Sequence, residues 1–477
     1  MDSLVCGIDV GSTNVKVILV DRSARSVWTK AIPVPRSMYG GLPATDAAVL
    51  VATLEGLVIE GWRATGAATP LRAISITGVG EDGVPVSDDL RPLDLAIPWF
   101  DNRADNESQR LRDFAGESAG ESTRAGVSID SSRTAAKWLW LRENRPEVMR
   151  DAGLWLALTD YAAAWWSRTP FISETLAART ACYDVFSRTW MPAMLGACGA
   201  PPLPPVLAAG TVVGTVAAGP LLESGAAAGN TLIVAGGHDH PIAASAVRRL
   251  NGQALVDSLG TANLMYTEIE NVEPRADPFV AFSVPALGTP GVACLGVYEF
   301  SAALEPFRAR DSGVALSSFL AGGRLPGKPS TAWDISEALK RCLNPATNSA
   351  PYGDAVQLRA ALESGCLYAR RMLEAIRDTG STATPIYAVG GWARSDALLQ
   401  LRASVFGEAV ASVEESELTA LGAALIARDA IEPSETRLPF QRHVRFIQPL
   451  AEWQEIYEQY YPEFRERLDR FKEKRTA

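Results

Sequence analysis

Stretches of apolar residues separated by a short polar turn open the chain and predict a β-hairpin. Residues 4–10 and 15–20 are rich in Val, Ile and Leu, and they flank the turn formed by Gly11, Ser12, Thr13 and Asn14. β-branched runs on both sides of a polar turn are typical of paired strands. Because glycine lets the backbone approach a bulky anion, and because N–H groups and hydroxyls donate to phosphate oxygens, we expect a phosphate-binding turn here. Asp9 lies beside it and is expected to hold magnesium; an ordinary polar hairpin is the alternative.

Further along the chain, helix-type periodicities alternate with short apolar runs. Apolar residues recur every three or four positions over 46–64 and 355–377, whereas 71–77 and 385–389 are short continuous runs. The first pattern predicts helices and the second predicts strands. Other helices are expected over residues 109–114, 135–144, 154–166, 242–249, 396–406, 418–428 and 453–474. The alternation of helices and strands favours an α/β architecture.

The second half of the chain begins with an echo of the first hairpin. Apolar runs over 253–259 and 264–268 flank the small-residue turn Gly260-Thr261-Ala262-Asn263. Both turns begin with glycine and carry an asparagine three positions later. The chain has 477 residues, too many for one hydrophobic core. We therefore expect two related lobes, residues 1–248 and 249–477, facing each other across a cleft.

Composition and charge limit the partners of this protein. Apolar residues make up 47% and charged residues 21% of the chain, as in ordinary globular proteins. The net charge of −10 disfavours nucleic acids and anionic membranes, because both need a basic face. The N-terminal segment has no signal-peptide pattern, and no apolar run is long enough to span a bilayer. We expect a cytoplasmic protein with no nucleic-acid or membrane partner.

Cysteine and histidine usage limits the metal chemistry. The six cysteines are far apart and form no Cys-x-x-Cys pair, so we expect reduced and mostly buried thiols. Only three histidines are present, which disfavours a histidine-rich zinc site. Any metal should therefore be a hard ion on oxygen ligands, such as Mg²⁺.

Two strand-to-helix junctions carry residues suited to chemistry. The apolar run 231–234 leads into His238-Asp239-His240-Pro241, and the proline suits the first turn of the following helix. Asp239 is therefore expected where α/β folds place their chemistry, with a plain helix cap as the alternative. The second junction leads from 385–389 into Gly390-Gly391-Trp392-Ala393-Arg394. A glycine turn before a helix N-terminus suits a nucleotide.

Together these stretches resemble the FGGY family of carbohydrate kinases, which belongs to the actin-like ATPase superfamily. Residues 7–16 resemble the first phosphate motif of the family, 257–261 the second, and 390–395 with 421–424 the adenosine motif. Residues 236–239 resemble the segment with the catalytic aspartate, and 99–103 resemble the Trp-x-Asp-x-Arg element near the sugar. The resemblance covers nearly the whole chain. It implies two actin-like (ribonuclease H-like) α/β lobes, each a mixed sheet flanked by helices.

The resemblance implies a role for each matching residue. Asp239 would be the general base that takes a proton from the sugar hydroxyl as it attacks the γ-phosphate of ATP. Asp9 and Asp239 would serve Mg²⁺. Lys16 would contact phosphate, with a solvent-facing side chain as the alternative. The full set expected to bind the nucleotide is Gly11, Ser12, Thr13, Asn14, Lys16, Gly260, Thr261, Gly390, Gly391, Ala393 and Arg394.

On the sugar side the candidates are Glu81, Asp82, Trp99, Asp101 and Arg103. The carboxylates would accept hydrogen bonds from sugar hydroxyls, and the arginine would anchor the loop or the substrate; solvated loop carboxylates are the alternative. The loop over 79–83 differs from the Gln-Met-His-Gly of many xylulokinases and keeps only the Glu of the glycerol kinase Arg-Glu pair. The Gly-His-Asp sequence that ends at Asp239 is similar to that of deoxy-ketose kinases.

The sequence therefore predicts a kinase that uses ATP and Mg²⁺ to phosphorylate a terminal hydroxyl of a ketose or polyol. Closure of the lobes would exclude water from the reaction. A homodimer is expected by analogy with the family. One alternative is a catalytically silent sugar or nucleotide sensor of the same fold. Another is ATP hydrolysis for mechanical or chaperone work, which leaves residues 99–103 unexplained.

Overall fold

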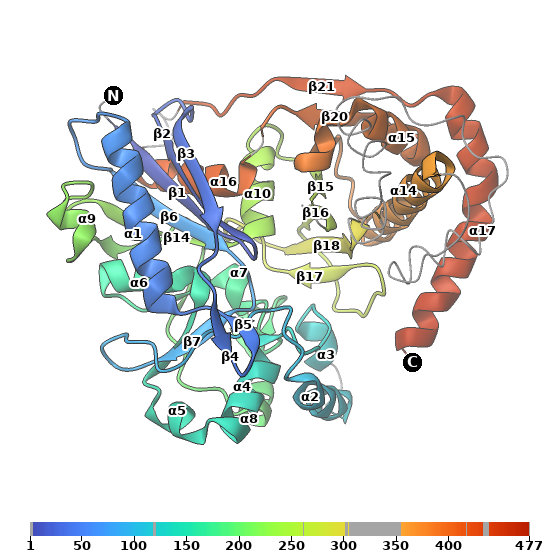
Figure 1. Cartoon of the computed structure of the whole chain (residues 1–477). Coiled ribbons are helices and arrows are strands. Elements are labelled where there is room, and N and C mark those ends of the chain that lie inside the picture. The colour runs from blue at the N-terminus through green and yellow to red at the C-terminus, as the bar shows by residue number, and fades with distance from the viewer. Residues whose placement is uncertain are drawn as a thin grey trace.

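Two mixed sheets form the framework of the computed structural model, which describes residues 3–117, 121–260, 262–300, 304, 354–415, 417–432 and 438–476 (Figure 1). Within these residues the first sheet has the order β13-β14-β6-β1-β2-β3 and the second has the order β17-β18-β16-β15-β19-β20-β21. The first contains β1 (Val5–Val10), β2 (Asn14–Val20), β3 (Ser26–Pro33), β6 (Ala73–Gly78), β13 (Val212–Thr215) and β14 (Leu232–His238). The second contains β15 (Leu255–Leu259), β16 (Asn263–Ile269), β17 (Ala281–Ser283), β18 (Val292–Tyr298), β19 (Ile386–Val389), β20 (Val410–Val413) and β21 (Val444–Ile447).

The same strand arrangement occurs at the centre of both sheets. In the first sheet β1 is antiparallel to β2 and parallel to β6, with Val10 opposite Val15 beside the turn. In the second sheet β15 is antiparallel to β16 and parallel to β19, with Leu259 opposite Asn263. The predicted echo between the two hairpins is therefore confirmed as an echo in sheet topology.

Helices α1 (Ala47–Ala64) and α6 (Leu158–Ser167) pack on one face of the first sheet. Asp46 caps α1, because its carboxylate accepts hydrogen bonds from the Ala48 and Val49 amides. The predicted apolar face of α1 is buried through Leu50, Leu54 and other residues. These helices and the apolar side chains of β1, β2 and β6 make one hydrophobic core.

Helices α10 (Asp239–Arg248) and α16 (Leu418–Ile431) lie between the two sheets in the centre of Figure 1. Their apolar side chains share a core with residues of both sheets. The contact between α16 and β1 is so close that a Cβ atom on Gly7 would lie 2.0 Å from the Ala420 carbonyl oxygen. Although α16 comes late in the chain, it therefore packs directly on the first sheet.

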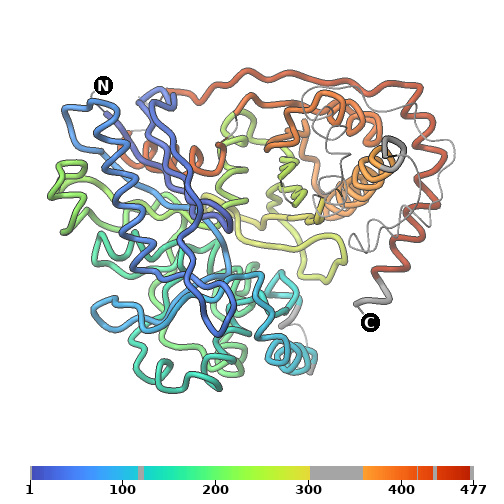
Figure 2. The backbone as a smooth tube through the Cα atoms, in the orientation of Figure 1, coloured from blue at the N-terminus to red at the C-terminus, as the bar shows by residue number. Residues whose placement is uncertain are grey.

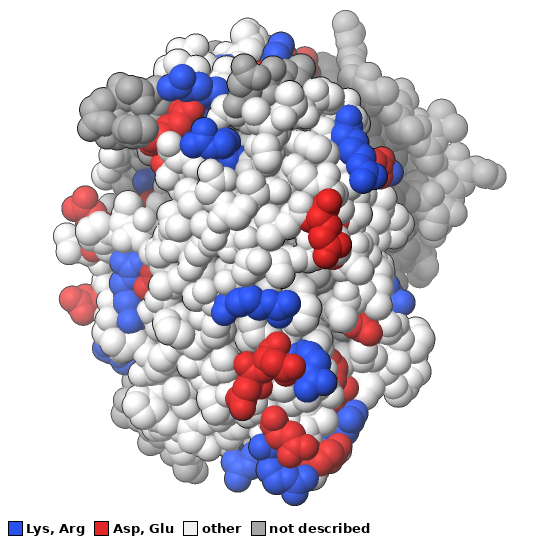
Figure 3. Space-filling view, turned by 90° about the vertical axis from the view of Figure 1, so that its left-hand side faces the viewer, with Lys and Arg blue, Asp and Glu red and all other residues white. Residues whose placement is uncertain are grey.

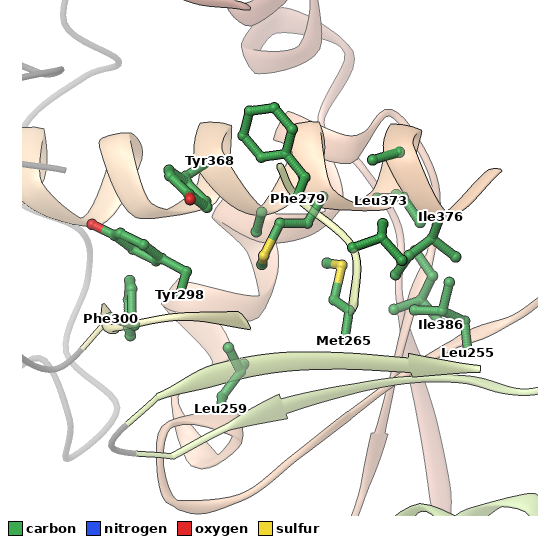
Figure 4. Close-up of a cluster of buried hydrophobic side chains, with 14 of the residues drawn as sticks. Leu255, Leu259, Met265, Phe279, Tyr298, Phe300, Tyr368, Leu373, Ile376 and Ile386 are labelled. Carbon is green, nitrogen blue, oxygen red and sulfur yellow. The ribbon is translucent and has the colours of Figure 1, made fainter. Parts of the chain in front are cut away.

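The other face of the second sheet is covered by α14 (Asp354–Asp378) and α15 (Asp396–Phe406). Figure 4 shows Met265 from β16 and Leu255 from β15 pointing towards Leu373 and Ile376 of α14. The C-terminal helix α17 (Ala451–Thr476) follows β21 and runs along the outside of this lobe, as the tube in Figure 2 shows. The bounds predicted for α15 are confirmed.

The remaining elements lie mostly below the first sheet in Figure 1. One prediction was wrong there: residues 154–157 form strand β8, and the helix begins only at Leu158. The strand forms because Leu154–Ala157 pairs with β7 (Gly83–Val86), a partner that lies far away in sequence. The other elements are β4 (Ser37–Tyr39), β5 (Leu42–Ala44), α2 (Asp105–Glu117), α3 (Glu121–Arg124), α4 (Thr134–Asn144), α5 (Pro146–Asp151), β9 (Ile172–Ser173), α7 (Glu174–Ala177), β10 (Tyr183–Asp184), β11 (Thr189–Trp190), α8 (Pro192–Cys198), β12 (Val206–Leu207), α9 (Pro220–Glu223) and the 3₁₀ helix η2 (Gly391–Arg394).

Three further features of the described residues are the distribution of surface charge, the hydropathy of the helices and the burial of the cysteines. Acidic and basic side chains are interspersed on the face in Figure 3 and do not gather by sign. Within the described part of the chain, no helix has the length and hydropathy needed to cross a membrane. Five of the cysteines are buried thiols, as predicted: Cys6, Cys182, Cys198, Cys294 and Cys366. Cys342 lies outside the described residues.

Candidate functional site

The first predicted phosphate turn joins β1 to β2. The Gly11 amide donates to the Asn14 carbonyl oxygen over 3.0 Å, which closes the turn and leaves Ser12 and Thr13 at its tip. A linker between β3 and β4 holds the turn from the side. The Val34 amide donates to the Thr13 carbonyl, and the Arg36 Nη2 atom donates to the Ser12 carbonyl over 2.6 Å. The turn is therefore held by hydrogen bonds to its backbone carbonyls, one of them from the Arg36 side chain, which leave its hydroxyls available.

Asp9 lies at the base of this turn and is almost fully buried, with 7% of its surface exposed. Its Oδ1 atom has no hydrogen-bond partner among the described residues. Burial and the nearby Asp239 carboxylate raise the pKa of Asp9 to about 8, although Lys16 opposes the shift. Lys16 alone does not supply enough positive charge to keep this carboxylate ionised, so the position fits a magnesium ion.

Lys16 is opposite Asp9 in the strand pairing and points to an acidic partner. Its Nζ atom lies 2.9 Å from Glu417 Oε2, and both side chains are about one-third exposed. Glu417 precedes α16, so the ion pair joins the first hairpin to the helix between the sheets. Lys16 therefore does not simply face solvent, because it pairs with Glu417.

Asp239 is the first residue of α10, directly after β14. The predicted strand-to-helix junction is confirmed. The His240 amide donates to Asp239 Oδ1 over 2.7 Å, and the imidazole Nε2 atom of His238 lies 3.3 Å from the same oxygen. The Asp239 side chain keeps 23% of its surface exposed. The carboxylate is thus oriented from one side and accessible from the other.

His238 is buried beside the loop over residues 79–83, which is predicted to bind the sugar. Its amide donates to Thr175 Oγ1 over 2.9 Å, and a Cβ atom on Gly80 would lie 2.8 Å from the imidazole ring. Burial lowers the pKa of His238 to about 4, despite the neighbouring Asp239 carboxylate. The imidazole is therefore neutral at physiological pH. Gly80 is the residue that lets the ring lie against this loop.

Glu81, a predicted sugar ligand, is held by two arginines. Its Oε1 atom accepts hydrogen bonds from Arg133 Nη1 over 2.7 Å and from Arg179 Nε over 2.8 Å. Burial favours the neutral acid, but the two guanidinium groups outweigh it and hold the pKa of Glu81 well below its usual range. This carboxylate is an ionised structural anchor as well as a candidate ligand.

Asp82 differs from Glu81 because it has one basic partner, the buried Lys137, at a longer distance. Only 3% of the residue is exposed, and its Oδ1 atom accepts no hydrogen bond from the described residues. Lys137 Nζ lies 3.7 Å from this oxygen. Burial raises the pKa of Asp82 to about 6, although Lys137 opposes the shift. Asp82 therefore retains an oxygen that can accept another hydrogen bond.

The predicted Trp-x-Asp-x-Arg element forms a compact unit. Asp101 accepts hydrogen bonds from Arg103 Nε over 3.0 Å and from Nη2 over 2.7 Å. The Arg103 guanidinium also lies over the Tyr39 ring, 4.5 Å from its centroid. Trp99 and Phe100 pack edge to face and remain about 40% exposed. The charged pair supports the loop, whereas the two rings present an apolar surface.

The second predicted phosphate turn joins β15 to β16. The Gly260 amide donates to the Ala262 carbonyl over 3.1 Å; Thr261 lies outside the described residues. Beneath the turn, Arg402 of α15 donates from Nε to Asp257 Oδ2 and from Nη2 to Oδ1, both over 2.8 Å. Asn263 Nδ2 also donates to Asp257 Oδ1. The polar side chains of this network are fully buried, so they fix the turn to α15.

The predicted adenosine turn lies beside the second phosphate turn. Gly390 has φ +94°, and a Cβ atom there would lie 2.7 Å from the Leu259 carbonyl oxygen. Only glycine fits this close backbone approach. In η2, Gly391 and Arg394 are exposed whereas Ala393 is buried. The Ser395 side chain then caps α15 by accepting a hydrogen bond from the Leu398 amide.

The sequence predictions missed five charged residues of this region: Arg36, Arg133, Lys137, Arg179 and Glu417. Each is isolated in sequence from the motif that it contacts, and no spacing rule connects them. A search for buried partners of the predicted carboxylates would have needed the fold. Within the described residues, no cluster of three or more His, Cys, Asp or Glu side chains suited to a metal is present.

Comparisons with known proteins agree with this architecture. Residues 4–246 match the model for the FGGY family of carbohydrate kinases, N-terminal domain, and residues 323–430 match its C-terminal domain. Xylulose kinase of Bacillus subtilis is 24% identical over 447 residues, covering 89% of this chain and 87% of that protein. Gluconate kinase from Lactobacillus acidophilus superposes with a TM-score of 0.82 at 17% identity, covering 98% of both chains. Ligand-bound xylulose kinase from the same organism gives 0.81 at 18%, covering 97% of both.

The chain belongs to the FGGY family of carbohydrate kinases, because the two family models together match most of its length. It is an ATP-dependent sugar kinase with the two-lobed actin-like fold. The predicted family, fold class and enzyme class are confirmed.

Proposed function

We propose that this kinase transfers the γ-phosphoryl group of ATP to a terminal hydroxyl of a ketose or polyol, with Asp239 as general base. The observation that supports this role is the position of the carboxylate at the β14–α10 junction. One oxygen is oriented by the His240 amide, while the side chain stays partly exposed. Such a carboxylate is rigid and can still reach a bound hydroxyl.

In the proposed reaction Asp239 takes the hydroxyl proton as the sugar oxygen attacks the γ-phosphorus. The bond between this phosphorus and the bridging β–γ oxygen breaks, and ADP leaves. Burial keeps the pKa of His238 near 4, so its imidazole is neutral at physiological pH and does not protonate the Asp239 carboxylate that must accept the proton. Its ring instead limits how far the carboxylate can rotate.

The two hairpin turns are proposed to hold the β- and γ-phosphates. Because the amides of Gly11 and Gly260 are used within their own turns, we assign the donor role to the tip residues Ser12 and Thr13 and to Thr261. Asn14 and Lys16 would complete the first site. Adenosine would lie against the exposed backbone of η2 and its flanking glycines, with Arg394 at its edge; Gly390, Gly391 and Ala393 shape this surface.

The residues around Asp9 fit Mg²⁺, since Asp9 presents a buried oxygen without a partner among the described residues and has a raised pKa. Asp9 would hold the ion directly or through water, with Asp239 as the second carboxylate. When bound, Mg²⁺ neutralises charge on the phosphates. Lys16 and Glu417 keep the neighbouring hairpin and α16 together during the reaction.

On the sugar side we propose that Asp82 accepts a hydrogen bond from a hydroxyl of the substrate, because one of its oxygens accepts none from the described residues. Trp99 would pack on the carbon skeleton of the sugar. Glu81, Asp101 and Arg103 would shape the site while bound to their own partners. Xylulose, the substrate named by the Bacillus relative, is one member of the proposed class.

Three further predictions belong to this proposal. A lobe division at residues 248 and 249 is supported by the end of α10 at Arg248, although α16 packs back on the first sheet. A cytoplasmic location suits an enzyme that consumes ATP. A homodimer stays a prediction by family analogy, and light scattering of the purified chain would test it.

The test is ADP release by the purified protein with Mg²⁺ and ATP against a panel of ketoses, polyols and sugar acids. One or more ketoses or polyols should stimulate release strongly, and Asp239→Asn should abolish the stimulation. Asp151→Asn, which changes an exposed carboxylate of α5, serves as the matched control and should behave as wild type. Stimulated release that survives in Asp239→Asn would refute the assignment of the base.

A further inference from the structure

Arg36 is a cation at the edge of the first phosphate turn whose described partners are all neutral. Its Nη2 atom donates to the Ser12 carbonyl over 2.6 Å, and Nη1 donates to Thr45 Oγ1 over 2.7 Å. Its guanidinium carbon lies 5.5 Å from the centre of the Phe100 ring. The side chain therefore lies between the phosphate turn and the aromatic pair of the sugar-side loop.

Three neighbouring arginines each have a carboxylate partner. Arg103 pairs with Asp101, while Arg133 and Arg179 share Glu81. No carboxylate of the described residues lies within 4.0 Å of Arg36 in an ion pair, and Asp82 acts on it only from a greater distance. Burial accordingly lowers the pKa of Arg36, with Asp82 opposing the shift.

A half-buried guanidinium without an anion is a costly arrangement unless a ligand supplies the charge. Guanidinium groups carry five N–H donors in a planar fork that matches phosphate and carboxylate oxygens. The two hydrogen bonds to Ser12 and Thr45 use only part of this capacity. These hydrogen bonds also orient the guanidinium, because they attach it to Thr45 and to the turn at Ser12.

We propose that Arg36 binds the anionic oxygens of a bound substrate between the Ser12 turn and Phe100. The inference rests on the proposed kinase function and deepens it. The anionic group that Arg36 would bind is a phosphoryl group or a carboxylate, and each comes from a different substrate. One is the γ-phosphoryl group in transfer, and the other is the carboxylate of an acidic sugar such as an aldonate.

The structure also provides a purely mechanical role against which the proposal must be tested. Arg36 connects the β3–β4 linker to the phosphate turn, and its loss would loosen that turn. Arg36→Gln removes the charge but retains a side chain that can donate to a carbonyl. Arg36→Lys keeps the charge and loses the fork. Arg25→Gln is the matched control, since Arg25 is an exposed arginine of the same lobe.

The experiment measures kcat and KM for ATP, for the best neutral acceptor and for gluconate, together with the thermal unfolding temperature. If Arg36 binds the transferring group, Arg36→Gln lowers kcat about 10- to 100-fold with every acceptor. If it binds a substrate carboxylate, the same variant raises KM about 10- to 100-fold for gluconate alone. In both cases Arg36→Lys should recover part of the loss. Kinetic constants within twofold of wild type for Arg36→Gln would overturn the proposal.

A binding measurement separates this proposal from the kinase function itself. Calorimetric titration of wild type and Arg36→Gln with a non-hydrolysable ATP analogue and with gluconate needs no turnover. A tenfold or greater loss of affinity for either ligand in the variant supports the anion role, even if no sugar is phosphorylated. Equal affinities in both proteins, or losses matched by Arg25→Gln, contradict it. A loss that occurs only with a lowered unfolding temperature and is not recovered by Arg36→Lys assigns Arg36 the mechanical role.

Discussion

Replacing Asp9 by asparagine should stabilise the metal-free protein while it removes kinase activity. Burial and the nearby Asp239 raise the pKa of Asp9 from an ordinary value of 3.8 to about 8. At neutral pH the unfolded chain therefore carries an ionised Asp9, whereas the folded chain must protonate it. The Asp9→Asn variant removes this requirement, because an amide does not titrate.

The size of the effect follows from the separation between the two pKa values. At pH 7 the solution lies about three pH units above the pKa of the unfolded carboxyl, and each unit corresponds to about 1.4 kcal/mol, which gives about 4 kcal/mol as an upper value. Burying the new amide without partners costs about 1–3 kcal/mol. A net gain of about 1–3 kcal/mol in the free energy of unfolding remains.

The pH dependence has a definite sign. For Asp9 the folded pKa is raised, so its contribution to stability is fully present below pH 3.8 and is lost as the pH rises to about 8. The advantage of Asp9→Asn should therefore be small at pH 4.5, grow up to pH 8 and stay constant above it.

Urea unfolding in EDTA at several pH values measures this difference, and ADP release measures activity. Added Mg²⁺ with ADP should raise the unfolding temperature of wild type much more than that of Asp9→Asn. The control is Asp151→Asn, whose stability should not depend on pH in this way. An Asp9→Asn protein that is less stable than wild type at pH 8 in EDTA would refute the reasoning.

Three further substitutions test the scaffold. Arg402→Met should cost about 3–5 kcal/mol in urea unfolding, because it leaves a buried carboxylate unpaired, whereas Arg445→Met at an exposed pair should cost less than about 1 kcal/mol. Gly7→Ala should lower stability by about 1–3 kcal/mol or more and reduce kcat, while Gly252→Ala, with open space around it, should do neither. Glu81→Gln should lower the free energy of unfolding by about 3–5 kcal/mol in calorimetry, because it leaves Arg133 and Arg179 without their ionised partner.

Local patterns were sufficient to predict the elements that carry the motifs. The Gly11–Asn14 turn, the junction at Asp239 and the bounds of α15 depend on residues that are neighbours in sequence. Turn residues, strand propensity and helix capping all act at that range. These features therefore needed no knowledge of tertiary contacts.

The sequence predictions were wrong or incomplete where a contact with a residue far away in sequence decides the structure. Leu154–Ala157 has enough apolar character for a helix or a strand, and its pairing with β7 selects the strand. The position of α16 on β1 depends on the close approach at Gly7, which a sequence pattern does not reveal. The arginines on Glu81 are 52 and 98 residues away from it. Charge pairing at such separations follows from the fold alone.

The charges around the candidate site explain how an acidic chain can be built to receive ATP. Glu81 and Asp101, two carboxylates proposed to lie beside the sugar, are paired with arginines, and Glu417 is paired with Lys16. Among the described residues Asp9 has no ion-pair partner and Asp82 has only Lys137, 3.7 Å away, and burial raises the pKa of both acids. Burying these two carboxylates is unfavourable in the empty protein. A bound cation at Asp9 and a substrate hydroxyl at Asp82 would relieve that cost, as expected of residues in a binding site. The free energy of unfolding that the empty protein loses at these two positions should therefore be regained as free energy of ligand binding.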